Sequence, residues 1–122
     1  MPGKSILTVD DSRLARLMIR GIFAELCPDW RLMEAANGDE ALRRVADGLP
    51  DLALIDINMP GMSGLDLCVK LLERAPTLRI TLVTANIQEK MRHRAAALGV
   101  GFMEKPVTRE KVKTLLDRLG LT

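Results

Sequence analysis

Short apolar runs alternate along the chain with stretches in which apolar residues recur every three or four positions. The apolar runs predict five strands, at residues 5–9, 31–35, 51–56, 79–84 and 100–103. The spaced stretches predict five helices, the first beginning near residue 12 and the others spanning about 39–46, 63–74, 87–98 and 108–119. This strict alternation predicts an α/β fold, with a parallel sheet, right-handed connections and helices on both faces.

Two helices carry apolar residues whose arrangement bears on function. In the first helix, apolar residues spaced by four, with others beside them, predict the core stripe: Leu14, Met18, Ile22 and Leu26, flanked by Ala15, Ile19 and Phe23. Three arginines of that helix share one face, which is ordinarily just solvated, although a docking role is an alternative: Arg13, Arg16 and Arg20.

The third helix is apolar at more positions than one buried stripe needs: Leu65, Leu67, Cys68, Val69, Leu71 and Leu72. A contact surface there is one interpretation, beside simple burial.

The composition excludes several classes of protein. The 122 residues are 48% hydrophobic and 28% charged, as in a folded domain, and we expect a single domain over residues 1–122. The formal charge of +2 is too small to indicate binding to nucleic acid. No apolar run approaches the roughly 20 residues of a membrane span. Because the start of the chain has no signal-peptide pattern, the expected location is the cytoplasm, without a membrane partner.

Side chains that can do chemistry stand where the predicted strands end. Asp10 and Asp11 follow the first strand, Asp56 ends the third, Thr84 ends the fourth, and Lys105 follows the fifth. In an open parallel sheet, ligands bind beyond the carboxyl ends of the strands. We therefore expect these five side chains to meet at one edge of the sheet.

Three clustered carboxylates repel one another, because two unit charges about 4 Å apart cost about 4 kcal/mol at an effective dielectric of about 20. They therefore either raise a carboxyl pKa or hold a cation, and oxygen ligands completed by water favour Mg²⁺. Lys105 and the cation would be two positive groups around a phosphoryl group, with Thr84 as a hydrogen-bond donor. One carboxylate would be the nucleophile. Asp10 and Asp11 taken alone, however, are equally typical of a helix cap.

Longer motifs surround these residues. They are Val9–Ser12, Glu34–Leu42, Asp56–Leu65, Thr84–Ala85 and Lys105–Pro106. In this order, and over essentially the whole chain, they resemble the CheY-like receiver domains of two-component response regulators. The resemblance implies a flavodoxin-like (βα)5 fold, in which a doubly wound parallel sheet of five strands has the order 2-1-3-4-5.

The resemblance also implies roles for the acidic residues. Asp56 would accept a phosphoryl group from a sensor histidine kinase or a histidine phosphotransfer protein. Mg²⁺ would be bound directly by Asp11 and mainly through water by Asp10. Asp56 itself and the backbone carbonyl of Asn58 would complete the protein ligands of the metal.

Four further positions follow the same resemblance. Thr84 and Lys105 would hold the phosphoryl group, and the peptide bond between Lys105 and Pro106 would be cis. Phe102 stands where the family often has tyrosine and would be the aromatic switch, turning inward as Thr84 moves. The output would be altered protein contacts at the fourth helix, fifth strand and fifth helix. Such a domain promotes only its own phosphotransfer and dephosphorylation, and is not an enzyme in the usual sense.

Several alternatives stay open at the level of sequence. The chain could be the receiver of a longer regulator with a separate output domain, or an interaction module that works without phosphorylation. A flavin protein would need a Ser, Thr and Gly-rich loop after the first strand, where this chain has two carboxylates. A phosphatase with an aspartyl nucleophile would need an acid at the position of Asn58. Because no linker or second domain is visible, we expect signalling by contact with a protein that the sequence does not identify, and not with nucleic acid.

Overall fold

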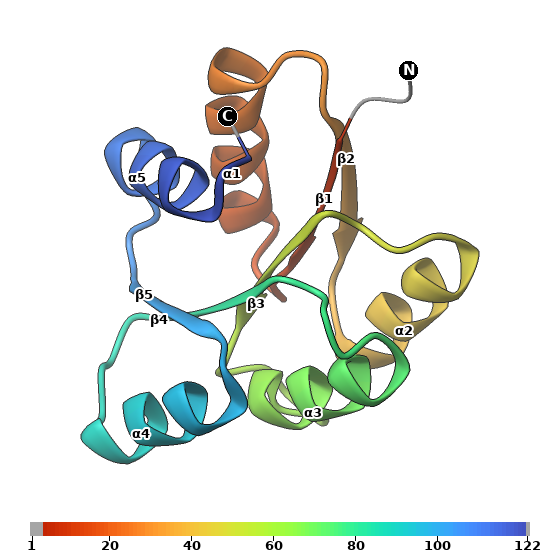
Figure 1. Ribbon diagram of the computed structural model, residues 1–122, viewed down its shortest axis with the longest axis vertical. Helices are drawn as coiled ribbons and strands as arrows, with labels where there is room; N and C mark the ends of the chain where they lie inside the picture. The colour runs from red at the N-terminus through yellow and green to blue at the C-terminus, as the bar shows by residue number, and fades with distance from the viewer. Residues whose placement is uncertain (1–3, 122) are drawn as a thin grey trace.

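The computed structural model describes residues 4–121, in which strands and helices alternate along the chain (Figure 1). The strands are β1 (Ser5–Val9), β2 (Arg31–Ala35), β3 (Leu52–Asp56), β4 (Ile80–Thr84) and β5 (Gly101–Glu104). The helices are α1 (Arg13–Leu26), α2 (Gly38–Asp47), α3 (Gly64–Arg74), α4 (Glu89–Leu98) and α5 (Arg109–Leu119). The predicted alternation is confirmed. Within the described range no helix has both the length and the apolar character needed to cross a membrane.

The strands form one parallel sheet in the order β2-β1-β3-β4-β5, so the expected flavodoxin-like topology is confirmed. From β1 the chain winds outward to β2, and it then returns to place β3 on the other side of β1. The connections after β1 and β3 therefore leave the sheet in opposite directions and open a crevice between them. This crevice lies at the carboxyl ends of the strands and determines where the site can form.

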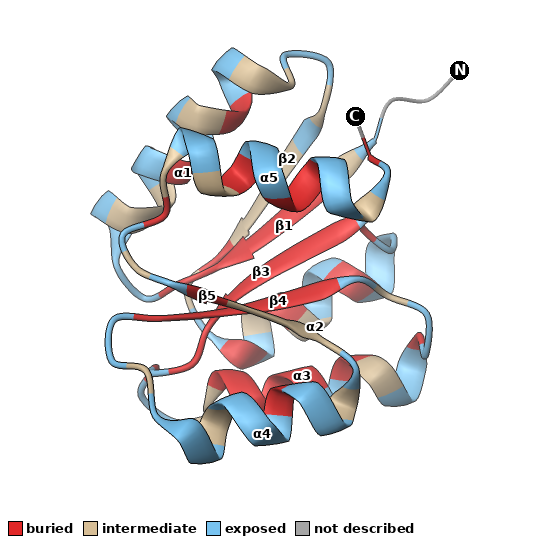
Figure 2. Ribbon diagram, turned by 60° about the vertical axis from the view of Figure 1, so that its left-hand side comes forward, coloured by how far each residue is buried: buried red, intermediate tan, exposed pale blue. Residues whose placement is uncertain are grey.

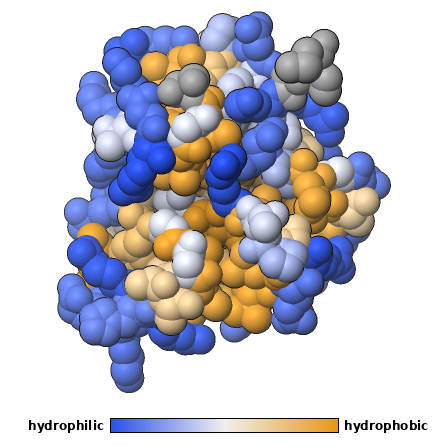
Figure 3. Space-filling model, viewed as in Figure 1, coloured by the Kyte–Doolittle hydropathy of each residue, from blue (hydrophilic) through white to orange (hydrophobic). Residues whose placement is uncertain are grey.

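Helices α1 and α5 cover one face of the sheet, and α2, α3 and α4 cover the other (Figure 1). Alternate residues of each strand enter the two cores: Ile6 and Leu54 pack beneath α1 and α5, whereas Leu7 and Ile55 pack on the opposite side. Burial is greatest in the central strands, and β3 and β4 are buried at every position (Figure 2). Figure 3 shows apolar side chains gathered in the middle of one face, with polar side chains around them. The residues that lead into the crevice thus stand on a rigid frame.

Polar side chains cap the starts of α1, α2, α3 and α5, whereas α4 begins without a side-chain cap. The side-chain oxygens of Ser12, Asn37, Ser63 and Thr108 each accept a hydrogen bond from a backbone N–H three residues further on. Such caps satisfy backbone donors that have no partner inside the helix, and each typically contributes about 1 kcal/mol. The caps of α1 and α3 also fix the loops that follow β1 and β3.

The predicted core stripe of α1 is confirmed at Ile19 and Phe23 and wrong at Leu14 and Met18. Leu14 and Met18 are 68% and 51% exposed, and the residues that α1 buries are Ile19 and Phe23. Leu17 is a further large apolar side chain on the outside of this helix, at 49% exposure. Apolar residues thus occupy more than one face of α1, and spacing alone does not determine which face meets the sheet.

Most of the apolar side chains of α3 are buried in the core. Leu65, Leu67, Cys68 and Leu71 are buried, and Val69 alone among the large apolar residues of this helix reaches 37% exposure. Burial raises the pKa of the Cys68 thiol to about 11. Burial between neighbouring elements, and not a contact surface, therefore accounts for the composition of α3.

Thr8 of β1 carries the one buried side-chain oxygen in the described residues that has no hydrogen-bond partner. We expect Thr8→Val to raise the free energy of unfolding by about 1 kcal/mol, because valine has the same shape without the unpaired hydroxyl. Urea denaturation monitored by circular dichroism measures the change. The matched control is Thr108→Val, which removes the hydroxyl that caps α5 and should cost about 1 kcal/mol. A Thr8→Val protein no more stable than the native one would contradict the prediction.

Candidate functional site

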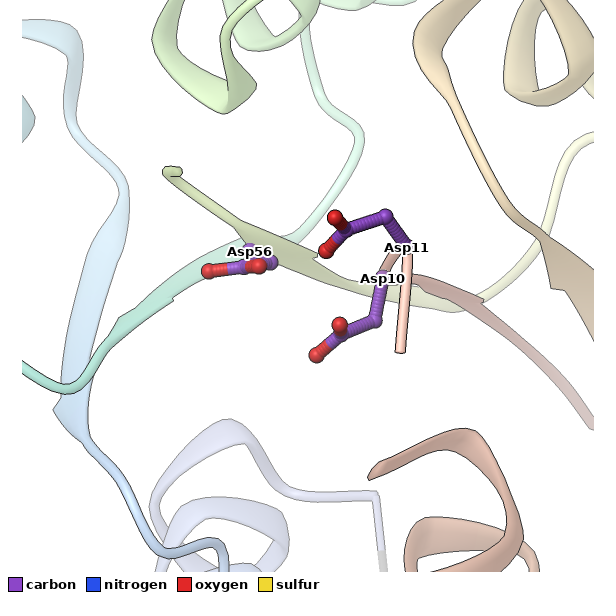
Figure 4. Close-up of side chains that lie close together, drawn as sticks. All are labelled: Asp10, Asp11 and Asp56. Carbon is purple, nitrogen blue, oxygen red and sulfur yellow. The ribbon is translucent and has the colours of Figure 1, made fainter. Parts of the chain in front are cut away.

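Three carboxylates meet where β1 and β3 end. Asp10 and Asp11 directly follow β1, and Asp56 is the last residue of β3 (Figure 4). One oxygen atom from each of the three side chains lies within 4.8 Å of the others. Asp10 and Asp56 are only 3% and 6% exposed, whereas Asp11 is exposed to solvent. The structure therefore gathers the acidic residues that the sequence places at separate strand ends.

Lys105 enters the same crevice from the loop after β5. Its Nζ lies 2.9 Å from Asp10 Oδ2 and 3.6 Å from Asp56 Oδ2, so one ammonium contacts both buried carboxylates. The peptide bond between Lys105 and Pro106 is cis. When all these groups are ionised, one positive charge faces three negative charges, and the site as a whole attracts cations.

The charges of the site shift two pKa values in the same direction. Burial raises the pKa of Asp56, the negative charges of Asp10 and Asp11 raise it further, and Lys105 opposes them. For Lys105, burial alone lowers the pKa, but the hydrogen bond and charge of Asp10, with the charge of Asp56, outweigh it and raise the pKa above its ordinary value. The ammonium thus stays protonated at neutral pH, whereas the Asp56 carboxylate is held at an electrostatic cost.

Thr84 ends β4 beside this cluster and is 2% exposed. Its hydroxyl donates to the backbone carbonyl of Asn86 (3.3 Å) and accepts from the side-chain amide of Asn58 (3.4 Å). The backbone N–H of Asn58 donates to Asp56 Oδ1 (3.3 Å). Thr84 is therefore linked to Asp56 through the loop after β3, and its hydroxyl is within reach of the site without bonding the carboxylate.

Asp10 is held by four hydrogen bonds. Its Oδ1 accepts from the N–H of Ser12 (2.9 Å), and its Oδ2 accepts from Lys105. Its own N–H donates to the carbonyl of Ala35 in β2 (3.1 Å), and its carbonyl accepts from the guanidinium of Arg16 (2.6 Å). Both the side chain and the backbone of Asp10 are thus fixed.

Sequence analysis missed the part that Arg16 plays. Its Nε pairs with Glu34 Oε1 of β2 at 3.3 Å, and its side chain is only 16% exposed, so it is not simply solvated. Glu34 also pairs with Arg20, and its backbone carbonyl accepts from Arg44 Nε (3.1 Å). The spacing of the arginines along α1 gave no signal of this network, because Glu34 lies on a separate element, β2.

Gly64 begins α3 directly against the backbone of Asp56. A Cβ atom at this position would lie 2.1 Å from the carbonyl oxygen of Asp56 and 2.8 Å from the Cα of Ile57. The N–H of Gly64 donates to the carbonyl of Ile57 (2.9 Å), which closes the loop after β3. Any residue with a side chain would therefore have to displace the backbone that carries Asp56.

The donor set of the crevice suits a hard divalent cation. It offers carboxylate oxygens, no sulfur, and an excess of negative charge. Asp11 faces solvent, so water can complete a coordination shell, as Mg²⁺ usually requires. The residues present thus fit Mg²⁺ better than a soft transition metal.

Phe102 lies away from the carboxylates, on β5 and facing α4. It is partly buried, and the guanidinium of Arg92 from α4 is 5.8 Å from the centre of its ring. Its position beside β4, opposite Leu82, places it two residues from the level of Thr84 in the sheet. Phe102 thus lies between β4, which ends in Thr84, and α4.

Comparisons with known proteins agree with this geometry. The sequence is 34% identical over 116 residues to the positive alginate biosynthesis regulatory protein of Pseudomonas aeruginosa, covering 93% of this chain and 46% of that protein. It is 30% identical over 119 residues to the chemotaxis protein CheY of Thermotoga maritima, covering 97% of this chain and 98% of CheY. The chain thus spans about half the length of the alginate regulator and of two further curated relatives.

A solved structure shares both fold and sequence. The response regulator protein TrrA of Thermotoga maritima, solved in complex with Mg²⁺–BeF, has a TM-score of 0.83 and 28% identity, over 95% of this chain and 98% of that one. The response regulator receiver domain family matches residues 6–117. Sequence, topology and family match together show that this chain belongs to the receiver domains of response regulators, which are signalling domains of two-component systems.

Proposed function

We propose that residues 1–122 form a single receiver domain, and that the carboxylate of Asp56 is its phosphoacceptor. The phosphoryl group would come from a phosphohistidine of a sensor histidine kinase or a histidine phosphotransfer protein. The bond from phosphorus to the imidazole nitrogen breaks, the bond from phosphorus to an Asp56 oxygen forms, and the leaving imidazole takes up a proton. The observation that carries this proposal is a buried carboxylate at a strand end, between two further carboxylates and the ammonium of Lys105.

The residues around Asp56 would bind the metal ion and the phosphoryl group. Asp11, Asp10, Asp56 and the loop carbonyl of Asn58 would hold Mg²⁺, which when bound supplies positive charge to the carboxylates and to the phosphoryl oxygens. Lys105 supplies the second positive charge, because its ammonium already contacts the buried carboxylates. The Thr84 hydroxyl exchanges its bond to the Asn86 carbonyl for one to a phosphoryl oxygen. The structure of TrrA in complex with Mg²⁺–BeF supports a magnesium-dependent phosphoacceptor site in a receiver of this kind.

Phosphorylation in solution tests the proposal. The protein is incubated with acetyl phosphate, with and without Mg²⁺, and its intact mass is measured by mass spectrometry. We expect the mass of one added phosphoryl group on the native protein with Mg²⁺, and none on Asp56→Ala. An unmodified native protein, or an adduct that persists in Asp56→Ala, would refute the assignment of Asp56.

The exposed apolar side chains of α1 support a partner that docks beside the site. Leu14, Leu17 and Met18 are each about half exposed or more. Met18 also lines a largely apolar cavity of about 300 Å³ that Asp10 and Lys105 border. A partner helix that covered this surface would bring its phosphohistidine to Asp56 and keep water from the reacting groups.

The proposed output is a change in the contacts of α4, β5 and α5. Phe102 serves as the switch residue, because it packs beneath α4 and against Arg92. When Thr84 turns toward the phosphoryl group, the space that it leaves allows the ring to move inward. The altered surface would then favour a downstream protein, as in a population shift between two conformations.

Asn58 and Asn86 are expected to control how long the phosphoryl group survives. Both residues bond the Thr84 hydroxyl, and this supports a position from which they would control the approach of water to a phosphoryl group on Asp56. We expect Asn58→Ala and Asn86→Ala to change the first-order rate of dephosphorylation by about threefold or more, while the dissociation constant for Mg²⁺ changes less. Decay of the adduct, followed by mass spectrometry after removal of the donor, gives the rate. Unaltered decay in both variants would contradict this prediction.

A further inference from the structure

Arg16 bridges the backbone of the loop after β1, which carries Asp10 and Asp11, and a side chain of β2. Its Nη1 donates to the carbonyl of Asp10 at 2.6 Å, and its Nε pairs with Glu34 Oε1 at 3.3 Å. Both side chains of the ion pair are mostly buried, at 16% and 24% exposure. A bridge of this kind, shielded from solvent, holds its members more firmly than a surface ion pair does.

The carbonyl that Arg16 contacts belongs to the peptide group joining Asp10 to Asp11. A peptide group is planar, so fixing its oxygen also fixes the direction of the Asp11 N–H and the position of the Asp11 Cα atom. The opposite side of Asp10 is already fixed, because its N–H donates to the carbonyl of Ala35. The Asp11 side chain is exposed and forms no hydrogen bond with any of the residues 4–121 that would orient it. Its direction toward Asp56 therefore depends on the backbone that precedes it (Figure 4).

Glu34 determines where the guanidinium of Arg16 can lie. Its carboxylate forms an ion pair with Arg16 through one oxygen and accepts a hydrogen bond from Arg20 on the other, and Arg44 donates to its backbone carbonyl. β2 is aligned with β1 so that Glu34 stands opposite Thr8, two residues before Asp10. A residue of the edge strand is thereby connected through one arginine to the loop that carries the carboxylates.

We propose that Arg16, held by Glu34, is a positioning residue for the metal site: it fixes the Asp10–Asp11 peptide and so aims the Asp11 carboxylate at the position of Mg²⁺. This inference rests on the proposed function, because it assumes that the three carboxylates bind the cation. Arg16 itself contacts neither the metal nor the phosphoryl group. Loss of partners that orient metal ligands typically weakens metal binding by 10–100-fold.

Removal of the Arg16 guanidinium distinguishes an effect of its charge from an effect of its positioning role, because the two change the affinity for Mg²⁺ in opposite directions. Arg16→Gln deletes a positive charge near the site, and Coulomb's law alone would then give tighter binding of Mg²⁺. Loss of positioning gives weaker binding, and we expect the dissociation constant to rise by about tenfold. Arg16→Lys keeps the charge but replaces the planar fork by a single ammonium, so we expect it to recover little of the lost affinity.

Isothermal titration of the whole protein with MgCl₂ measures these constants. The matched control is Arg109→Gln, which removes an arginine that also pairs with a glutamate, Glu25 of α1, but at an exposed position (3.0 Å) away from the carboxylates. We expect the control to bind Mg²⁺ within twofold of the native protein. A second readout is the Asp11 amide resonance in a ¹H–¹⁵N spectrum without Mg²⁺, which should move in Arg16→Lys and stay in place in Arg109→Gln.

The acetyl phosphate reaction separates positioning from a general structural defect. We expect phosphorylation of Arg16→Lys to be slow at low Mg²⁺ and to come within about threefold of the native rate at saturating Mg²⁺. Affinity in Arg16→Lys equal to that of the native protein, or tighter binding in Arg16→Gln, would overturn the inference. If Arg16→Gln does not fold, the Arg16→Lys result decides alone. A native protein that binds no Mg²⁺ would instead refute the proposed function, so the two failures are distinguishable.

Discussion

Gly64→Ala is expected to lower the free energy of unfolding by about 3 kcal/mol or more, because a Cβ atom would have to displace backbone and not a flexible side chain. The atoms that it meets are the carbonyl carbon and oxygen of Asp56 and the Cα of Ile57, at 2.1–2.8 Å. Any movement that relieves the overlap shifts Asp56, the proposed phosphoacceptor. We therefore expect phosphorylation by acetyl phosphate to slow by at least about tenfold in protein that is still folded. Urea denaturation and intact mass measure the two effects.

The control for Gly64→Ala is Gly21→Ala. Gly21 lies within α1, and no atom stands within 4 Å of the position that its Cβ would occupy. Within a helix, alanine is more stable than glycine by up to about 1 kcal/mol, so the free energy of unfolding of this variant should exceed that of the native protein. Its phosphorylation should proceed at the native rate. If Gly64→Ala is as stable as Gly21→Ala and is phosphorylated at the same rate, α3 does not approach β3 as closely as the structure indicates, and the prediction is contradicted.

Asp56→Asn is expected to make the metal-free protein more stable at pH 7, by about 1 kcal/mol or about 4 °C in Tm, while it abolishes phosphorylation. Burial, Asp10 and Asp11 raise the pKa of Asp56 in the folded protein, so ionisation of Asp56 opposes folding. The cost is present in full above the raised pKa. It is lost as the pH falls through the raised pKa and below 3.8, the ordinary value, because the carboxyl is then protonated in both the folded and unfolded states.

Thermal unfolding at several pH values measures this difference. The gain in Tm should be largest at neutral pH and should disappear below about pH 4. At pH 7, Mg²⁺ should reduce the difference in Tm between Asp56→Asn and the native protein. A cation bound by all three carboxylates stabilises the native protein more than the variant, which has lost one of them. Asp29→Asn, at an exposed position in the loop before β2, serves as the control and should leave Tm nearly unchanged. A less stable Asp56→Asn at pH 7 would show that the carboxylate is not under electrostatic cost.

Strand positions and helix ends could be read from the sequence because local interactions determine them. β3 is an apolar run buried on both sides, and Ser63 and Thr108 mark helix starts by capping them. The buried face of α1 could not be read in the same way. Its apolar residues surround much of the helix, and contacts with β1 and α5 determine that Phe23 is buried and Leu14 exposed.

The site was predictable to the extent that topology alone produces it. Parallel strands end at one edge, so Asp10 and Asp56 had to come close once the strands were assigned. The interactions that orient these residues were not predictable from pattern. The pairing of Arg16 with Glu34 depends on the register between β1 and β2, and the tight packing of Gly64 depends on the angle at which α3 approaches β3.

The network around Glu34 also protects the border of the sheet. β2 is an edge strand, and the carbonyl of Ala35 points inward to Asp10, so the carbonyl of Glu34 before it points outward, to the free edge. Arg44 of α2 donates to that outward carbonyl. An unfolding neighbour or an extended peptide that tried to add a sixth strand would therefore meet an occupied acceptor and a positive charge, two features that oppose edge-to-edge aggregation.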